Sequence, residues 1–215
     1  IKDDHINNAN LVICHTRMPS PGIPVNKKNA HPFRYNSVIG VHNGTVANHT
    51  DIKHSGDVDS QAIFHLLSLK KNRFEEVFPE LNGSMAVAWV YDGDPNLYLM
   101  RHVSPLNMVV HNKTLYFNSE AIVLASTLQA VGCDEPIEEL DEDTVYTITP
   151  SLDITKTKVT FKPYYTAPTA ETGKTSLLYP NGERKSYGLA PEYTFPPALP
   201  AGTPEPGRSR HNIIV

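Results

Sequence analysis

Short apolar runs separated by polar turn residues dominate the first three quarters of the chain. Runs of about four to eight residues rich in β-branched and aromatic side chains are typical of strands. Such runs predict strands at residues 11–14, 37–42, 84–91, 97–101, 108–111, 115–118, 144–148 and 158–162. Because Asp92-Gly93 and Asn112-Lys113 are turn sequences, we expect the strands between 84 and 118 to form one antiparallel meander.

Residues 60–69 carry apolar side chains at the spacing of an amphipathic helix. Asp59 or Ser60 is predicted to be the N-cap or a first-turn residue of this helix, where a carboxylate is favoured by free backbone N–H groups and the helix dipole. Shorter helices are predicted at 73–78 and 120–127. Since strands outnumber helices but both are needed, the pattern favours an α+β fold.

The pattern changes after residue 162. Residues 163–215 hold 9 of the 18 prolines and 5 of the 10 tyrosines, but few apolar runs that could form a core. We therefore expect one domain at 1–162 and an extended Pro/Tyr-rich tail at 163–215. The tail is either flexible or an arm that docks on a protein partner or a neighbouring copy of the chain, and its tyrosines favour docking.

Composition excludes several classes of protein. Nineteen basic against 23 acidic side chains give a net charge of −4, so no overall positive field favours nucleic acid or an anionic membrane surface. The sequence has no membrane-spanning apolar run and no segment resembling a signal peptide, which predicts a soluble cytoplasmic protein. Cys14 and Cys133 form no CxxC pair and indicate a reducing compartment. No histidine pair has HxxxH or HxH spacing with supporting carboxylates, so we expect neither a metal nor a cofactor.

In the segment 37–44, a predicted apolar strand is followed directly by Asn43-Gly44. This dipeptide is a strong signal for a two-residue hairpin turn. It also suits an oxyanion hole, because the Asn43 amide and the Gly44 N–H are adjacent donors. An amino-acid substrate needs a guanidinium for its carboxylate and an anion for its ammonium group, and Arg17 and Asp59 are of the right types. These residues alone leave both interpretations open.

Several motifs occur in a fixed order between residues 10 and 150. They are His15-Thr16-Arg17, Asn29-Ala30-His31-Pro32-Phe33, Val41-His42-Asn43-Gly44, Asp59-Ser60-Gln61, Leu81-Asn82-Gly83-Ser84, Arg101 with Ser104-Pro105-Leu106, Phe117-Asn118-Ser119-Glu120-Ala121 and Leu140-Asp141-Glu142-Asp143-Thr144-Val145. This order resembles the glutaminase domain of class II glutamine amidotransferases, which are N-terminal-nucleophile hydrolases. The resemblance implies an αββα four-layer sandwich of two mostly antiparallel sheets. It also implies glutamine as the substrate, hydrolysed to glutamate and ammonia.

The resemblance assigns roles to four residues of the predicted site. Arg17 would bind the substrate α-carboxylate, and Asp59 would bind its α-amino group. Asn43 and Gly44 would form the oxyanion hole. A synthase of this family would need a further domain to accept the ammonia, and residues 163–215 are not expected to form one.

Three further residues would support the site. His42 is next to the expected oxyanion hole and His31 lies in a neighbouring motif, so both are expected to hold the site in place. Ser20 falls where the family often has a threonine whose backbone helps to hold the substrate. The prolines beside Ser20 depart from the usual sequence of this loop and stiffen it.

The family places its nucleophilic cysteine at the mature N-terminus, where the α-amino group serves as the base. Residue 1 is isoleucine, so we expect the nucleophile upstream of Ile1 and a sequence that begins within the domain. Strand alternation would direct Cys14 to the face opposite Arg17, in apolar surroundings. Cys133 precedes an acidic run. Neither cysteine is therefore expected to be the nucleophile.

Two other functions are compatible with the sequence. A protein that kept the fold and lost the chemistry would act as a structural or protein-interaction module, with its tail docking on a partner. An amidase of the same superfamily acting on another amide would not need Arg17 and Asp59 to bind the two charges of an amino acid. Glutamine hydrolysis is favoured because Arg17, Asn43, Gly44 and Asp59 occur together.

Overall fold

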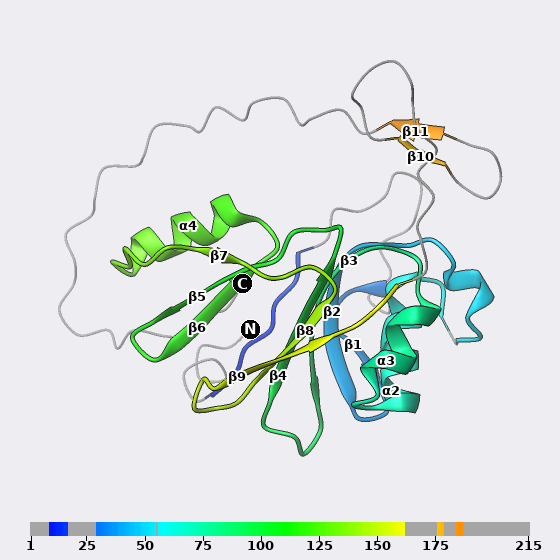
Figure 1. Ribbon diagram of the computed structural model, residues 1–215, viewed down its shortest axis with the longest axis horizontal. Helices are drawn as coiled ribbons and strands as arrows, with labels where there is room; N and C mark the ends of the chain where they lie inside the picture. Colours follow the sequence, from blue (N-terminus) through cyan, green and yellow to red (C-terminus); the bar gives the residue numbers. More distant parts are fainter. Residues whose placement is uncertain (1–8, 17–28, 55, 162–175, 179–183, 187–215) are drawn as a thin grey trace. The chain divides into compact units, whose positions relative to one another are not determined.

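Two antiparallel sheets form the framework of the residues that this computed structural model describes, which are 9–16, 29–54, 56–161, 176–178 and 184–186. The larger sheet has the strand order β1-β2-β3-β4-β8-β9 (Figure 1). Its strands are β1 (Phe33–Tyr35), β2 (Val38–Val46), β3 (Gly83–Tyr91), β4 (Leu97–His102), β8 (Thr144–Ile148) and β9 (Ile154–Lys158). The smaller sheet, of order β6-β5-β7, contains β5 (Asn107–His111), β6 (Thr114–Asn118) and β7 (Glu138–Glu139).

Alternate side chains of β3 point to opposite faces of the larger sheet and pack in two different core clusters. Met85, Val87 and Trp89 face α2 (Ser60–Lys70) and α3 (Phe74–Val77), whereas Ala86 and Ala88 face the smaller sheet. The side chains of alternate residues therefore pack against a helix layer on one face and a second sheet on the other. Two single-turn 3₁₀ helices are also present: η2 (His49–Asp51), and η3 (Phe78–Glu80), which follows α3 directly and contributes buried Phe78 to the same cluster as Trp89.

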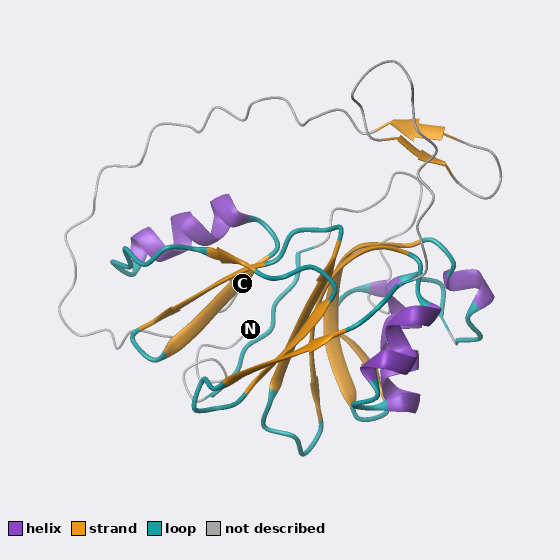
Figure 2. Ribbon diagram, viewed as in Figure 1, coloured by secondary structure: helices purple, strands orange, loops and turns teal. Residues whose placement is uncertain are grey.

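The last layer is α4 (Ala121–Ala130), which covers the outer face of the smaller sheet (Figure 2). Leu124 and Leu128 of this helix share a buried cluster with Val109 of β5 and Tyr116 of β6. The order of the layers is thus helix, sheet, sheet, helix. The predicted α+β class and αββα four-layer sandwich are confirmed.

The expected single meander from 84 to 118 is wrong, because the chain changes sheets after β4. Val103 has a positive φ of 63°, and the Ser104 N–H donates to the His102 carbonyl in a tight turn. Pro105 then lacks an N–H to continue a ladder. The chain leaves the larger sheet here, and β5 and β6 pair with each other in the smaller one.

Two other predicted strands differ from the structure. Residues 11–14 form no strand, although Leu11 and Ile13 still pack against the core between the sheets. The last hairpin arm lies at Ile154–Lys158 and not at 158–162. This strand is polar and mostly exposed at the edge of the sheet, so an apolar pattern could not reveal it. The helices predicted at 60–69, 73–78 and 120–127 are present as α2, as α3 with η3, and as α4.

Two short strands beyond residue 162 belong to a separate unit of the chain. Strands β10 (Ser176–Leu178) and β11 (Arg184–Ser186) pair antiparallel, with Leu177 opposite Lys185. The sequence pattern had predicted only extended structure there. Within the described residues, no helix has the length and apolar character that crossing a bilayer requires.

Candidate functional site

A cavity of about 660 Å³ lies between the carboxyl half of β2, the start of α2 and the segment that joins β6 to α4. Its lining includes five of the residues singled out from the sequence: His31, His42, Asn43, Gly44 and Asp59. These residues come from three segments that are separated by up to 28 positions in the chain. Arg17 and Ser20, the other two predicted site residues, lie outside the described residues.

Asn43 and Gly44 lie within β2 and do not form a hairpin turn. Asn43 pairs with Ala86 and Gly44 with Met85 of β3, and the ladder continues to Val46. Gly44 has a φ of +139°, and a Cβ there would lie 2.0 Å from the Ser84 carbonyl oxygen. The glycine is therefore required by a close approach of two strands, and the turn interpretation is wrong.

The Asn43 side chain is exposed at the mouth of the cavity, on the face of β2 directed towards the smaller sheet. Its Nδ2 donates to the Ser119 hydroxyl at 3.0 Å. Ser119 lies between β6 and α4, so this hydrogen bond links the two sheets at the cavity. One amide hydrogen of Asn43 is held in this bond, and the second N–H of the amide is the donor available to a ligand.

His42 points to the opposite face of β2 and is buried beneath the cavity. Its Nδ1 is 2.8 Å from the Ser60 hydroxyl, and its Nε2 is 3.5 Å from the Ser84 carbonyl oxygen. Since a carbonyl only accepts, we assign the proton to Nε2, so that Nδ1 accepts from the Ser60 hydroxyl. Burial lowers the pKa of His42 and outweighs the attraction of nearby Asp59, which keeps the ring neutral.

Asp59 occupies the predicted N-cap of α2. Its Oδ1 accepts from the Ser60 N–H at 2.8 Å, which confirms the capping role. Its Oδ2 accepts from the Val46 N–H at 2.8 Å, where β2 ends. One carboxylate thus joins the strand that carries Asn43 and Gly44 to the helix beneath them.

The segment 14–16 completes the described wall of the cavity. Cys14, His15 and Thr16 all line it, whereas strand alternation predicted opposite directions for neighbouring side chains. The difference arises because, among the described residues, no strand pairs with this segment to impose alternation. The rings of His15 and His31 lie 4.0 Å apart between centroids, and His31 meets Phe33 edge-on at 4.5 Å.

Sequence reasoning missed the contact roles of Ser60 and Ser119. Ser60 contacts His42, which lies 18 positions earlier in the chain. Nothing in the local sequence around either residue indicates this contact. Ser119 belongs to a motif that carried the family resemblance, but its pairing with Asn43 spans 76 positions and depends on the packing of the two sheets.

A pH-dependent contribution of His42 to stability is expected. The unfolded ring has an ordinary pKa of about 6.5, whereas burial lowers the pKa of the folded ring, so near and below pH 6.5 the unfolded state binds this proton more fully than the folded state does. The contribution of this group to the free energy of unfolding should therefore be fully present above about pH 6.5 and should be lost progressively as the pH falls below that value. His42→Asn should reduce this pH dependence in urea titrations at successive pH values. Ser60→Ala, which keeps the imidazole, should retain it; equal pH dependence for His42→Asn and wild type would contradict the assignment.

Comparison with known proteins agrees with the motif order and the fold. Residues 21–126 match the family model described as a glutamine amidotransferase domain. A glutamine–fructose-6-phosphate aminotransferase from Brucella suis biovar 1 is 30% identical over 130 residues, covering 53% of this chain and 21% of the relative. The corresponding enzyme of Rhizobium meliloti is 26% identical over 129 residues, with the same coverage. The chain thus spans about a fifth of the length of these curated relatives.

A solved structure shows the same fold at low sequence identity. Glutamine phosphoribosylpyrophosphate amidotransferase from B. subtilis, complexed with ADP and GMP, matches with a TM-score of 0.50 and 15% identity over 62% of this chain and 32% of that one. Its fold, the matched segment 21–126 and the ordered motifs agree with one another. Residues 21–126 are therefore similar to glutamine amidotransferase domains, and the described fold is similar to that of the B. subtilis amidotransferase.

Proposed function

We propose that the cavity binds glutamine and hydrolyses its carboxamide to glutamate and ammonia. The observation that carries this proposal is the placement of Asn43, Gly44 and Asp59 around one cavity, although they come from a strand and a helix start. An oxyanion hole needs two adjacent hydrogen-bond donors, and a bound amino acid needs an anion near its ammonium group. The Asn43 amide and Gly44 N–H are suited to the first role, and the Asp59 carboxylate is suited to the second.

The reaction requires a thiolate on the open side of the Asn43 and Gly44 donors. Attack on the carboxamide carbon forms a C–S bond and places negative charge on the oxygen, which the two donors stabilise. The C–N bond of the tetrahedral intermediate then breaks. The leaving nitrogen takes up the proton that the thiol gave up and departs as ammonia. Water then attacks the thioester, releasing glutamate and restoring the thiol.

Asp59 retains acceptor capacity for the substrate. An ionised carboxylate offers about four lone-pair sites, and the backbone N–H groups of Val46 and Ser60 use one on each oxygen. A substrate ammonium group can therefore bind without displacing either bond. Arg17 would hold the α-carboxylate at the other end of the substrate, and Ser20 would contribute backbone from the same loop.

The test is covalent labelling of the full-length gene product with a glutamine analogue that carries a diazoketone in place of the carboxamide. We expect one label per chain, on a cysteine, together with the loss of ammonia release from glutamine. The family resemblance implies an N-terminal cysteine, and Cys14 is the cysteine of the described residues that lines the cavity. Peptide mapping will assign the label. A protein that neither reacts with the analogue nor releases ammonia would refute the proposal and favour the interaction-module alternative, which no comparison supports.

We further propose that residues 163–215 form an arm that binds a protein partner or another copy of the chain. Proline-rich extended segments suit this role because they lose little conformational entropy on binding. The acceptor of the ammonia would then lie on another domain or chain. A chain ending at residue 162 that keeps the oligomeric state and partners of the full chain would contradict the arm.

A further inference from the structure

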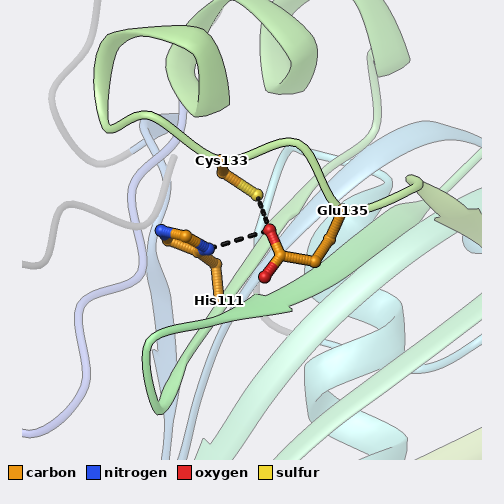
Figure 3. Close-up of side chains that lie close together, drawn as sticks. All are labelled: His111, Cys133 and Glu135. Atoms are coloured by element: carbon orange, nitrogen blue, oxygen red, sulfur yellow. Dashed lines mark hydrogen bonds and ion pairs between the residues drawn. The ribbon is translucent and has the colours of Figure 1, made fainter.

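We propose that His111, Cys133 and Glu135 form a binding site for one Zn²⁺ ion, outside the glutaminase cavity. Figure 3 shows the three side chains converging from β5 and from the segment after α4. Their donor atoms, an imidazole nitrogen, a thiol sulfur and a carboxylate oxygen, all lie within 4.8 Å of one another. Zinc prefers this mixture of ligands, and three protein ligands leave a fourth position for water.

Cys133 is held by the end of α4. Gly132 adopts a left-handed φ of 68°, the Cys133 N–H donates to the Leu128 carbonyl at 3.0 Å, and the Gly132 N–H donates to the Gln129 carbonyl at 3.2 Å. These two bonds form a Schellman motif, in which the residue after the glycine packs back on the helix. Cys133 is accordingly buried in one cluster with Leu128. The thiol is placed by the backbone of the helix end before any ion binds.

His111 and Glu135 are held by the smaller sheet. His111 is the last residue of β5, and the following turn residues, Asn112 and Lys113, both have positive φ. Glu135 lies between Cys133 and β7, which pairs with the start of β5. All three side chains are therefore on segments fixed at both ends, as a preformed metal site requires.

In the absence of an ion, hydrogen bonds hold the three side chains together. Glu135 Oε2 accepts from the Cys133 thiol and from His111 Nδ1, each at 2.8 Å. Burial and the contact with Glu135 raise the pKa of the Cys133 thiol, and the two donors lower the pKa of Glu135 to about 2. A Zn²⁺ ion would bind the same three atoms, releasing the thiol proton to solvent, while the ring proton of His111 would leave Nδ1 and Nε2 would take one up, so that the imidazole stays neutral.

Asn112 is placed to stabilise the metal-bound form of His111. Its side-chain amide lies 2.8 Å from His111 Nε2. With Nδ1 coordinated to zinc, Nε2 must carry the ring proton, and rotation of the amide by half a turn presents its oxygen as the acceptor. Metal-ligating histidines usually have such an acceptor on the other nitrogen.

A second cluster of potential ligands provides a contrast. His102, Glu142 and Asp143 also gather within reach of one ion, but they offer no sulfur. The ring of His102 is stacked on Phe161 at 3.9 Å, and Glu142 accepts from the Val103 N–H at 2.7 Å. These side chains have structural partners of their own, and the cluster lacks the donor that favours zinc over magnesium or calcium.

The experiment measures Zn²⁺ binding to the untagged full chain after chelation and removal of metal, with a thiol-free reductant. We expect one Zn²⁺ per chain by isothermal titration calorimetry, and a near-ultraviolet thiolate charge-transfer band when Co²⁺ is the probe. Cys133→Ser, His111→Ala and Glu135→Gln should each weaken Zn²⁺ binding at least tenfold. Cys14→Ser and His102→Gln are the matched controls and should retain it.

A second readout needs no variant. Zn²⁺ should slow the alkylation of Cys133 by iodoacetamide at least tenfold, as mapped by mass spectrometry, and leave Cys14 unaffected. Unchanged alkylation of Cys133 at saturating Zn²⁺ would overturn the proposal, as would wild-type affinity in folded Cys133→Ser and His111→Ala. Ammonia release is not part of either readout, so failure of this proposal is independent of the glutaminase function.

Discussion

Replacing Asn43 with alanine is expected to reduce the kcat of ammonia release from glutamine by about 10²- to 10³-fold, with a much smaller change in KM. The reason is that one of the two proposed oxyanion donors is removed, and its contribution is realised mainly in the tetrahedral transition state. The side chain is exposed and its partner in the structure is the Ser119 hydroxyl. The free energy of unfolding should therefore change by no more than about 1 kcal/mol. Steady-state ammonia assays and urea unfolding of the full-length product measure both quantities.

Asn43→Asp separates the loss of a donor from the loss of volume. The aspartate keeps the shape but places an acceptor opposite the developing negative charge, so it should be at least as inactive as alanine. The matched control is Asn36→Asp, since Asn36 is also exposed and donates to a serine hydroxyl, that of Ser68, at 3.2 Å. Asn36 does not line the cavity. Full activity in Asn43→Asp would contradict the proposed role of Asn43 as an oxyanion donor.

Replacing Gly44 with alanine should have the largest effect on stability. The new Cβ would lie 2.0 Å from the Ser84 carbonyl oxygen and 3.0 Å from His42 Nε2, at a φ of +139° that L-residues rarely adopt. Strain at such a backbone position costs about 1–3 kcal/mol and overpacking about as much again, so we expect a loss of about 3 kcal/mol or more. Relief of the clash would separate β2 from β3 at the cavity, and ammonia release should be lost as well.

Gly93→Ala is the control for this substitution. Gly93 also has a positive φ, of 79°, but an added Cβ there meets no atom within 4 Å. It should therefore show only the cost of the left-handed backbone conformation for an L-residue, about 1–2 kcal/mol. Equal losses in urea unfolding for the two variants would show that the contact with Ser84 is not the reason for the glycine at position 44.

The sequence predicted those parts of the fold whose pattern is local. The helix at 60–69 and the strand at 144–148 have clear apolar periodicity, and the structure has them as α2 and β8. The two-sheet arrangement depends on the change of direction at Val103, a β-branched residue with positive φ that no propensity indicates. Residues 11–14 have the composition of a strand, but no strand in the described ranges pairs with them, and a strand requires a partner.

In the candidate site too, features with a local sequence pattern were predictable and features that depend on tertiary contacts were not. The position of Asp59 and Ser60 before an apolar stripe predicts that one of them caps the helix, and the hydrogen bond from the Ser60 N–H shows that the cap is Asp59. The placement of Asn43 and Gly44 within a strand could not be decided by their own dipeptide, because a hairpin turn and a continuous strand use the same two residues. The approach of Cys14 to the cavity was missed because alternation was applied to a segment that is not a strand.

The two hydrogen bonds that Asp59 accepts from backbone N–H groups affect how related sequences should be compared. Its carboxylate caps α2 and also accepts a hydrogen bond from the last residue of β2. Loss of the carboxylate would therefore destabilise the fold even in a protein that binds no substrate. Gly44 is fixed by the contact with Ser84 for the same kind of reason. A descendant that had abandoned catalysis would still keep both residues. If the proposed oxyanion role is correct, Asn43 is the more informative residue for activity, because the described structure uses its amide in one exposed hydrogen bond, to Ser119.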